Sequence, residues 1–485
     1  MIESTNLKGT AAKGLLWSAI DRFGSQGIQL FFGILVTRIL LPEDYGLVGM
    51  ILIFMVLGQT LIDSGFSSAL IWKRNSTLID YSTVFYLSIL ISFLIYFIVF
   101  LIAPLVSDFY NEPRLTDLIR VLCLNFIFLS FGIIQQIILQ KTVDFKVLAY
   151  INISGSFVSG IVSYYLAYKG FGVWAIILQV ILKSFLTTFL LWIFNKWRPM
   201  FAFSWNSFKQ LFDFGSKLAL AGLINTIFQY LYFNVIGKLF TPASLGFYTR
   251  AVQIQEFPVK TIAGIFQKVT FPVFSSIQDD NERLKNAVRK ALRTMVFFTF
   301  PILFGLIAIS DELIVVVLTE KWISASEYFK LLCVVGLFYS FQTINNEIIK
   351  TKGKSGWILK LELITKIILV VNIFITYRWG ISAIILGQLA TVFTTYLIGS
   401  YYVWKLIGYS IWQQIKDIAI YLLLSAFMFL IVSAFVFLPT HPIIKLFAMI
   451  ISGSVFYFSA VYLLKLEEMN EIKHLCKSAC PKLFS

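Results

Sequence analysis

Charged side chains are scarce in this sequence: Asp, Glu, Lys and Arg together make up only 13% of its 485 residues. Hydrophobic residues make up 58% and aromatic residues 17%, and the mean hydropathy is +0.83. A soluble domain of this length cannot bury so much apolar surface, so the composition excludes that class. The formal charge of +15 is dispersed among apolar segments, which indicates a membrane and not a nucleic acid as the partner.

Cysteine and histidine are also rare, with four and two residues. The cysteines lie far apart or in the C-terminal tail, so no disulfide framework is expected. His441 and His474 both fall outside the long apolar runs, which argues against a histidine proton relay within a membrane. His474, Cys476 and Cys480 have a spacing that metal sites use, but three ligands on a terminal tail are more often incidental. We therefore expect neither a metal nor another cofactor.

Apolar runs long enough to cross a bilayer recur along the whole chain. Because one span needs about 20 residues, we predict an all-α polytopic membrane protein with about 14 transmembrane helices. The first run is too long and too polar for a signal peptide, so we expect it to remain as the first span. The predicted spans are 14–40, 46–70, 82–105, 115–139, 147–168, 172–194, 210–240, 246–277, 294–318, 328–349, 357–377, 380–404, 415–438 and 443–464.

The loops between these spans differ in basic content. Lys and Arg are concentrated in every second loop and in both terminal segments. The positive-inside rule then places both termini in the cytoplasm, which also requires an even number of spans. None of the loops has room for a folded soluble domain.

Two helix breaks are related by one constant offset. The segment LPEDYGL at 41–47 joins the first two spans, and FTPASLG at 240–246 joins the seventh and eighth. Polar and Pro/Gly interruptions at matching places in two halves are typical of duplicated transporters with a substrate site between the halves. The matched pairs are Gln29 and Gln229, Arg38 and Lys238, Pro42 and Pro242, and Gly46 and Gly246.

The repeat and the shifts in composition predict three parts. Residues 1–200 and 201–408 are expected to form two six-helix bundles, and 409–485 an added helix pair with a cytoplasmic tail. We expect Pro42, Gly46, Pro242 and Gly246 to act as hinges.

The first and eighth spans carry charges that lipid does not tolerate. A charge near the bilayer centre costs about 3 kcal/mol on the insertion scale, so Asp21 and Arg22 should face protein or water. In the eighth span, Arg250, Lys260 and Lys268 share one helical face with Gln253. This basic balance predicts an anionic substrate, and Arg suits bidentate phosphate contacts. The expected anion-binding residues are Arg22, Lys217, Arg250, Lys260 and Lys268, and the expected cavity or ion-coupling residues are Asp21, Gln29, Asp63, Gln229, Glu256, Asn345 and Glu347.

Each of these charges also has a purely structural explanation. Glu256 and Lys260 are spaced for an i,i+4 pair, and the other acids can neutralise neighbouring bases. Arg38, Arg120 and Lys238 lie near span ends and can reach the interface, whereas Lys183 and Lys366 line a cavity or are simply paired. The basic segment 279–293 is expected to be an amphipathic connector lying on anionic lipid.

Several short segments resemble polysaccharide exporters of the colanic-acid type. They are WSAI at 17–20, LPEDYGL at 41–47, DSGF at 63–66, FPVFSSIQDD at 271–280, EKW at 320–322 and LLCVVGL at 331–337. The chain resembles these Wzx-type flippases of the polysaccharide transport family, in the MOP superfamily, over nearly its whole length, least in the last two spans. The family has no strict catalytic motif that would transfer to this sequence, so the candidate residues above depend on the charge pattern.

The resemblance implies a function and a location. Wzx-type proteins have two six-helix bundles around a central cavity and move an undecaprenyl-diphosphate-linked glycan across the bacterial inner membrane by alternating access. The expected partners are the lipid-linked oligosaccharide, membrane lipids, and the polymerase and chain-length machinery that assemble capsule, exopolysaccharide or O-antigen. The bound diphosphate would contact the basic residues named above.

Two other functions stay open. An ion-coupled small-molecule exporter of the same superfamily would share the topology, although its sites for cationic drugs are typically acidic. A membrane-embedded glycosyltransferase or polymerase would need catalytic carboxylates on an outer loop, where Asp311, Glu312 and Glu320 are the candidates. The short loop makes this second alternative the weaker, so we do not expect an enzyme.

Overall fold

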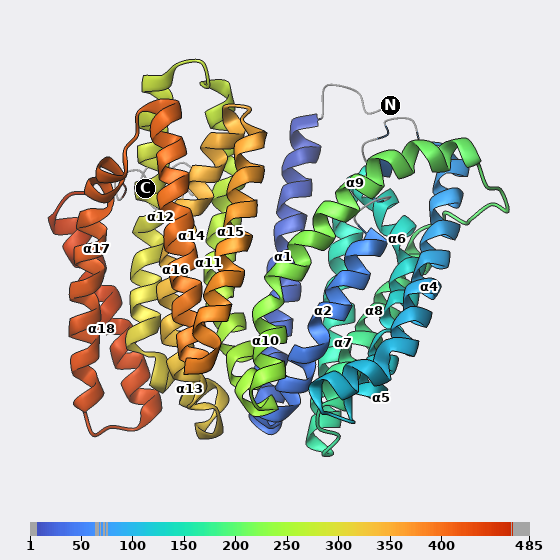
Figure 1. The fold of residues 1–485 in the computed structure, drawn as a ribbon, viewed down its shortest axis with the longest axis horizontal. Helices are drawn as coiled ribbons and strands as arrows, with labels where there is room; N and C mark the ends of the chain where they lie inside the picture. Colours follow the sequence, from blue (N-terminus) through green and yellow to red (C-terminus); the bar gives the residue numbers. More distant parts are fainter. Residues whose placement is uncertain are drawn as a thin grey trace. The chain divides into compact units, whose positions relative to one another are not determined.

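The computed structural model describes residues 7–63, 67, 69, 70, 73, 76–466 and 468, and the described chain is built of α-helices joined by short loops (Figure 1). The helices up to the second break are α1 (Leu7–Ile39), α2 (Pro42–Asp63), α4 (Leu78–Tyr110), α5 (Leu115–Leu122), α6 (Asn125–Lys141), α7 (Phe145–Tyr168), α8 (Trp174–Phe194), α9 (Trp205–Gln229) and α10 (Leu231–Leu239). Those after it are α11 (Pro242–Ser276), α12 (Asn281–Ala308), α13 (Ser310–Leu318), α14 (Ala325–Thr351), α15 (Ser355–Thr376), α16 (Ile381–Ile407), α17 (Ile411–Ala434) and α18 (Pro442–Leu463).

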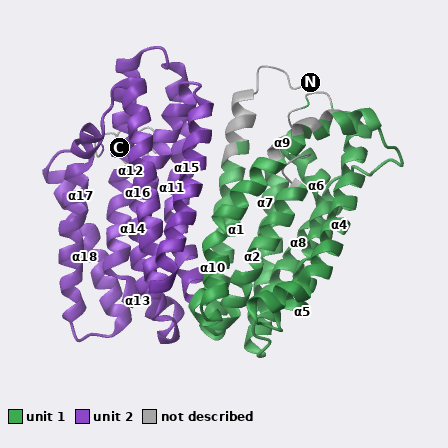
Figure 2. Ribbon diagram, in the orientation of Figure 1, with its two compact units in different colours: residues 1–246 green, residues 247–485 purple. Residues whose placement is uncertain are grey.

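The chain divides into two compact units, residues 1–246 and 247–485 (Figure 2). The boundary falls just inside the first turns of α11, directly after the second helix break. We call these unit 1 and unit 2. The three parts expected from the sequence, residues 1–200, 201–408 and 409–485, follow the internal repeat and stay a prediction.

Ten helices in the described residues are long and apolar enough to cross a membrane. They include α2, α4, α7 and α8 in unit 1 and α12, α16, α17 and α18 in unit 2. The prediction of an all-α polytopic membrane protein is confirmed. Four further predicted spans correspond to α1, α11, α14 and α15, which have 33, 35, 27 and 22 residues. Each of these four helices has charged residues within its predicted span. That these helices cross the membrane stays a prediction.

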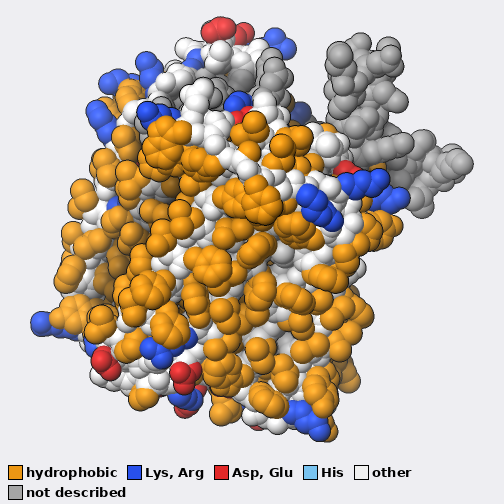
Figure 3. Space-filling model, turned by 90° about the vertical axis from the view of Figure 1, so that its right-hand side faces the viewer, with side chains coloured by type: hydrophobic (Ala, Val, Ile, Leu, Met, Phe, Trp, Pro, Cys, Tyr) orange, Lys and Arg blue, Asp and Glu red, His pale blue; other side chains and the backbone are white. Residues whose placement is uncertain are grey.

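The outer side of α4 shows how a span meets lipid. Seven large apolar residues in the middle of α4 recur at helical spacing and are between 47% and 66% exposed. In the space-filling view, a broad zone of apolar side chains covers the middle of one face, and charged side chains gather above and below it (Figure 3). The seven residues are Leu90, Phe93, Leu94, Phe97, Ile98, Leu101 and Leu105.

The start of α4 is fixed by local hydrogen bonds. Thr77 and Asp80 form a reciprocal capping box, in which the Asp80 backbone N–H donates to Thr77 Oγ1 (3.2 Å) and the Thr77 backbone N–H donates to Asp80 Oδ2 (2.8 Å). Lys73 Nζ lies 2.9 Å from Asp80 Oδ2. Lys141, at the end of α6, donates to Ser76 Oγ at 2.7 Å. These contacts hold the ends of α4 and α6 together in unit 1.

One expectation about the basic segment at 279–293 is wrong. The segment is not a separate connector on the membrane surface, because residues from Asn281 onward form the first half of the continuous helix α12. Its apolar residues Leu284, Val288 and Leu292 are at most 1% exposed and belong to the core of unit 2. The apolar side that would have entered lipid is therefore buried against protein.

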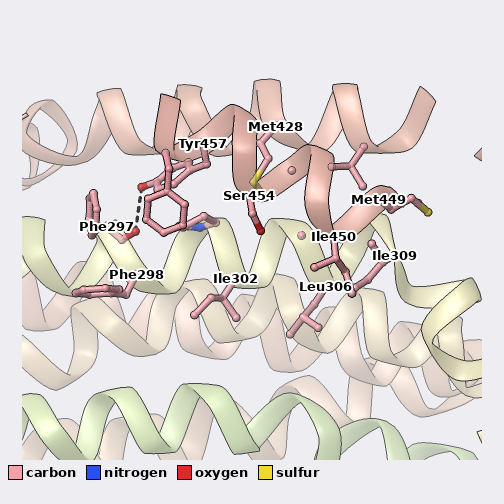
Figure 4. A pocket seen from close by; sticks show the side chains of 15 residues that line it. Phe297, Phe298, Ile302, Leu306, Ile309, Met428, Met449, Ile450, Ser454 and Tyr457 are labelled. Carbon is pink, nitrogen blue, oxygen red and sulfur yellow. Dashed lines mark hydrogen bonds between the residues drawn. The ribbon is translucent and has the colours of Figure 1, made fainter. Parts of the chain in front are cut away.

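The last two helices pack against α12 and leave an apolar groove of about 280 Å³ (Figure 4). Tyr457 of α18 crosses to α12, where its hydroxyl donates to the Phe297 carbonyl at 2.9 Å. Met428 and Met449 line the groove from α17 and α18, opposite Ile302 and Leu306 of α12. The added helix pair is thus an integral part of unit 2.

Candidate functional site

The two helix breaks predicted from the sequence are present. α1 ends at Ile39 and α2 begins at Pro42, and α10 ends at Leu239 and α11 begins at Pro242. Proline lacks a backbone N–H and is therefore well suited to the first turn of a helix. In the first break Asp44 Oδ2 accepts from the Leu41 backbone N–H at 3.1 Å, and in the second Thr241 Oγ1 accepts from the Ser244 backbone N–H at 3.3 Å. Different side chains thus cap the same turn.

The glycines of the two breaks make reciprocal backbone contacts. A Cβ added at Gly46 would lie 1.8 Å from the Pro242 carbonyl oxygen, and one added at Gly246 would lie 1.8 Å from the Pro42 carbonyl oxygen. Both distances are far below any real Cβ contact, so a side chain at either position would force the breaks apart. Glycine is required here by close approach, and the sequence repeat places it twice.

Side chains next to the second break contact α4 within unit 1. Lys238 Nζ donates to the Phe109 carbonyl and lies over the Phe109 ring, 4.7 Å from its centroid. Tyr110 donates its hydroxyl to Asn234 Oδ1 at 3.1 Å. The structural explanation for Lys238, a charge at a helix end held by backbone and aromatic groups, is therefore the one the structure supports.

On the basic face of α11, some basic residues contact a neighbour on the same helix and another has no ion-pair partner among the described residues. Lys260 lies 2.8 Å from Glu256 on the same helix, and both side chains are exposed. Arg250 donates to Gln253 Oε1 at 2.7 Å. Lys268 is exposed, and among the described residues it has no ion-pair partner. The predicted i,i+4 pair is confirmed, and it leaves the Lys260 ammonium accessible.

The two charges of α1 have different surroundings. Asp21 is half-buried and accepts hydrogen bonds from Ser25 Oγ at 3.2 Å and from Asn152 Nδ2 of α7 at 3.1 Å. Arg22 is exposed and forms no ion pair with any described residue. Asp21 thus helps to join α1 to α7, whereas Arg22 is exposed.

The other predicted site residues are scattered. Gln29 and Gln229 are exposed, and the side chains of Asp63 and Lys217 lie outside what the structure describes. Asn345 and Glu347 of α14 are each 3% exposed. Asn345 donates to Ser400 Oγ at 3.1 Å, and Glu347 lies 2.9 Å from Lys350. The polar groups of these two residues are used inside unit 2.

Sequence reasoning did not identify Asp417 of α17, a carboxylate that accepts four hydrogen bonds from described side chains of unit 2. Its side chain is 3% exposed and receives Arg289 Nε at 2.7 Å and Arg289 Nη2 at 2.8 Å. Arg293 and the Tyr409 hydroxyl also donate to it. Burial raises the pKa of Tyr409, and the negative charge of Asp417 adds to this, so the phenol stays protonated and donates. The signal in the sequence is weak, since Asp417 lies 128 residues from Arg289.

Two of the three carboxylates considered for a glycosyltransferase site are paired with lysines. Asp311 Oδ2 lies 2.7 Å from Lys330 Nζ, and Glu312 Oε1 lies 2.7 Å from Lys445 Nζ. The Lys445 and Glu312 side chains are 14% and 10% exposed, so this pair joins α13 to α18 inside unit 2. These ion pairs explain the acids without a catalytic role.

Comparison with known proteins identifies the family. The model of the family described as polysaccharide biosynthesis protein matches residues 35–327, which is more than half of the chain. This chain belongs to that polysaccharide biosynthesis family. Two relatives are the teichuronic acid biosynthesis protein TuaB of Bacillus subtilis (strain 168) and the lipopolysaccharide biosynthesis protein WzxC of Escherichia coli (strain K12).

The match to TuaB has 29% identity and covers 62% of each chain, so it spans less than two thirds of that relative. The match to WzxC has 26% identity and covers 79% of this chain and 77% of the relative. The resemblance to Wzx-type proteins is confirmed.

Two solved structures share the fold of this chain. The lipid II flippase MurJ in an inward closed conformation has a TM-score of 0.77 at 16% identity, covering 93% of this chain and 99% of MurJ. An inward-facing multidrug transporter of the MATE family has a TM-score of 0.61 at 16% identity, covering 81% of this chain and 98% of the transporter. At these identities the likeness shows the fold.

Proposed function

We propose that this polysaccharide biosynthesis family member is a flippase that moves an undecaprenyl-diphosphate-linked oligosaccharide across the bacterial inner membrane by alternating access. The observation that carries the proposal is the basic face of α11, where Arg250, Lys260 and Lys268 follow one side of a helix of membrane-spanning length. The family description and the relatives TuaB and WzxC, which are named for the biosynthesis of teichuronic acid and of lipopolysaccharide, support the substrate class.

The basic residues can lower the free-energy cost of moving a diphosphate out of water. Moving an ion from water into hydrocarbon costs many kcal/mol, and the cost falls only if other charges replace the hydration shell. Arg250, Lys260 and Lys268 of unit 2 supply this replacement, and Arg22 and Lys217 of unit 1 are further members of the predicted set. The polyprenyl chain stays in lipid while the diphosphate is held by charge-assisted hydrogen bonds.

The acids have a second role in the proposal. Glu256 holds Lys260 in position when no substrate is bound, and its exposure lets an incoming phosphate compete for the ammonium. Asp21 and Asp63 serve as counter-charges or as ion-coupling groups, and Gln29 and Gln229 serve as neutral polar or ion-coupling groups. Asn345 and Glu347 are buried in unit 2, where they contact Ser400 and Lys350, and they stay predicted ion-coupling residues.

The helix breaks act as hinges in this mechanism. Opening on one side of the membrane separates the reciprocal contact of Gly46 with Pro242 and of Gly246 with Pro42. Both termini lie in the cytoplasm, and the exported unit passes to the polymerase and chain-length machinery of surface polysaccharide assembly.

A leaflet-specific assay in the host tests the function. In a strain lacking this gene and any redundant flippase, lipid-linked oligosaccharide should accumulate on the inner leaflet, and one surface polysaccharide should be lost. A probe that reaches only the outer leaflet gives the measurement. Normal outward exposure with unchanged polysaccharide contradicts the proposal and favours the ion-coupled small-molecule exporter.

A glycine exchange tests the hinges separately. Gly46→Ala and Gly246→Ala should each hold the breaks apart and change the balance of conformations, which accessibility of an engineered cysteine to a membrane-impermeant thiol reagent measures. Gly27→Ala is the matched control, because a Cβ at Gly27 would meet no described atom within 4 Å. Equal accessibility in all three variants contradicts the hinge role.

A further inference from the structure

An exposed group of aromatic side chains lies on the segment that connects α8 to α9 in unit 1. Phe201 is fully exposed, and Phe203 and Trp205 are 49% and 60% exposed. The rings contact one another in a row, with 6.3 Å between the centroids of Phe203 and Trp205 and 4.9 Å between those of Trp205 and Phe208. Exposed apolar patches of this kind mark surfaces that bind another molecule or a membrane. We call residues 195–212 the aromatic connector.

Hydrogen bonds to the first turns of α4 hold the middle of the aromatic connector. The Met200 backbone N–H donates to Ser82 Oγ at 3.0 Å, and the Ser204 backbone N–H donates to Thr83 Oγ1 at 3.0 Å. Ser204 also caps α9, because its Oγ accepts from the Ser207 backbone N–H at 3.2 Å. The exposed rings between these contacts are therefore displayed by an anchored backbone.

The start of the aromatic connector is held by α6 and by the end of α8. Gln135 of α6 donates its amide to the Trp197 carbonyl at 3.1 Å. The Arg198 guanidinium turns back and donates to the Asn195 carbonyl at 2.8 Å and to the Trp192 carbonyl at 3.0 Å. Arg198 thereby satisfies carbonyl groups that the end of a helix leaves open.

The aromatic connector lies at the level where membrane spans end. The candidate span of α8 ends at Phe194, that of α4 begins at Leu78, and that of α9 and α10 begins only at Ala219. In Figure 1 the first turns of α9 run crosswise to α4 over the end at which α4 begins. This is the arrangement of a helix that lies in a membrane interface. The predicted topology places this interface on the cytoplasmic side.

The surroundings of the aromatic connector indicate what covers it. The neighbouring span ends expose apolar side chains, since Phe194 is 57% and Leu78 is 58% exposed, so the aromatic patch continues a lipid-facing surface. Residues 195–212 contain three bases and no acid, and two of the bases, Lys196 and Lys209, are exposed. Basic residues at the headgroup level attract the anionic lipids of the cytoplasmic leaflet. An anionic lipid surface matches both the apolar and the charged side chains.

We infer that the aromatic connector anchors unit 1 to the cytoplasmic leaflet, with Phe201, Phe203 and Trp205 inserted at the interface and Lys196 and Lys209 beside anionic headgroups. The inference does not depend on the proposed flippase activity. Aromatic rings favour the boundary between headgroups and acyl chains. Because α4 and α6 hold the backbone, the connector is a fixed point of unit 1 in the membrane.

Photocrosslinking of the full-length chain in liposomes tests the inference. The liposomes contain equal amounts of phosphatidylglycerol and phosphatidylcholine with identical acyl chains, and p-benzoylphenylalanine replaces Phe201 or, in a second variant, Trp205. Both positions are exposed, so the chain should fold normally, as thermal unfolding in detergent verifies. After irradiation, intact mass should show phospholipid adducts at both positions, with phosphatidylglycerol in excess.

The same photoreactive residue at Glu282 is the matched control. Glu282 is exposed and lies about 12 residues, or about 18 Å of helix, before residue 294, where the sequence places the start of the span. It should give no lipid adduct. An adduct yield at Phe201 and Trp205 no higher than at Glu282 overturns the inference. So does a crosslinked dimer in place of the lipid adduct, which would assign the patch to a second copy of this chain.

The charged half of the inference has its own variants. Combined with the photoreactive residue at 201, Lys196→Gln and Lys209→Gln together should lower the ratio of phosphatidylglycerol to phosphatidylcholine adducts by about fivefold, since basic residues near the surface attract anionic lipid. Lys354→Gln is the control, because Lys354 is an exposed lysine of unit 2, and it should leave the ratio unchanged. Equal adducts of the two lipids in the unaltered background, or an unchanged ratio in the double variant, overturns the assignment to anionic headgroups.

Discussion

The consecutive helices α11 and α12 both carry several basic residues, but the structure uses them differently. On α12, Arg289 and Arg293 converge on one buried carboxylate, Asp417, supplied by α17. On α11, Lys260 is paired with an exposed acid of its own helix, and Lys268 has no ion-pair partner among the described residues. One set of charges joins helices, and the other stays accessible.

The bases of α12 therefore serve helix packing, whereas those of α11 are available for binding. A buried carboxylate that receives four hydrogen bonds from two arginines and a tyrosine has no capacity left for a ligand. An exposed i,i+4 pair contributes little stability, because water screens it, and its ammonium can change partners. We therefore expect substitutions on α12 to affect stability and substitutions on α11 to affect transport.

The largest expected effect is on transport. Neutralising the α11 face with Arg250→Gln, Lys260→Gln and Lys268→Gln removes three charged hydrogen-bond donors, each contributing roughly 1.5 kcal/mol, so substrate affinity should fall by about a thousandfold. Flipping of lipid-linked oligosaccharide in proteoliposomes measures the loss, and the thermal unfolding midpoint should stay close to that of the unaltered chain. Wild-type transport by the triple variant would contradict the assignment of α11. Arg250→Lys alone should impair transport only partly, because it keeps the charge and loses the fork.

The largest effect on stability is expected at Asp417. Asp417→Asn leaves Arg289 and Arg293 without a counter-charge, which should lower the free energy of unfolding by about 3 kcal/mol, the lower end for a broken buried pair because both arginines are partly exposed. Denaturant unfolding in detergent measures this. If Asp417→Asn lowers the free energy of unfolding no more than Glu256→Gln does, burial of the carboxylate does not determine its contribution to stability.

The two arginines should differ from each other. Arg289 reaches both oxygens of Asp417 through Nε and Nη2, whereas Arg293 uses Nη2 alone. Lysine keeps the charge and loses the planar fork, so Arg289→Lys should cost about 1 kcal/mol more than Arg293→Lys. Thermal unfolding of the two variants under identical conditions gives the comparison, and the reverse order would argue against the bidentate contact.

The smallest effect is expected for the exposed pair of α11. Glu256→Gln should change the free energy of unfolding by about 0.5 kcal/mol or less, since both side chains are exposed and screened. The change should shrink further at high salt. A loss that is large and independent of salt would place Glu256 among the packing residues, beside Asp417.

Much of the fold follows from local patterns in the sequence. The apolar runs predict the helices, since each span must satisfy its own backbone within lipid. The breaks at Pro42 and Pro242 follow from proline and glycine chemistry, and the Glu256–Lys260 pair follows from helical spacing. The segment from Asn281 shows the limit of such patterns, because an amphipathic helix buries its apolar side equally well in lipid or in protein.

The sequence by itself determined that this chain is an all-α membrane protein with two matching helix breaks, because hydropathy and backbone chemistry act over a few turns of one helix. Only the tertiary structure decided which charges are neutralised. Asp417 meets Arg289 across 128 residues, and Gly46 meets Pro242 across the repeat. Such contacts depend on which helix faces pack together, and this is a property of the whole bundle that no single segment encodes.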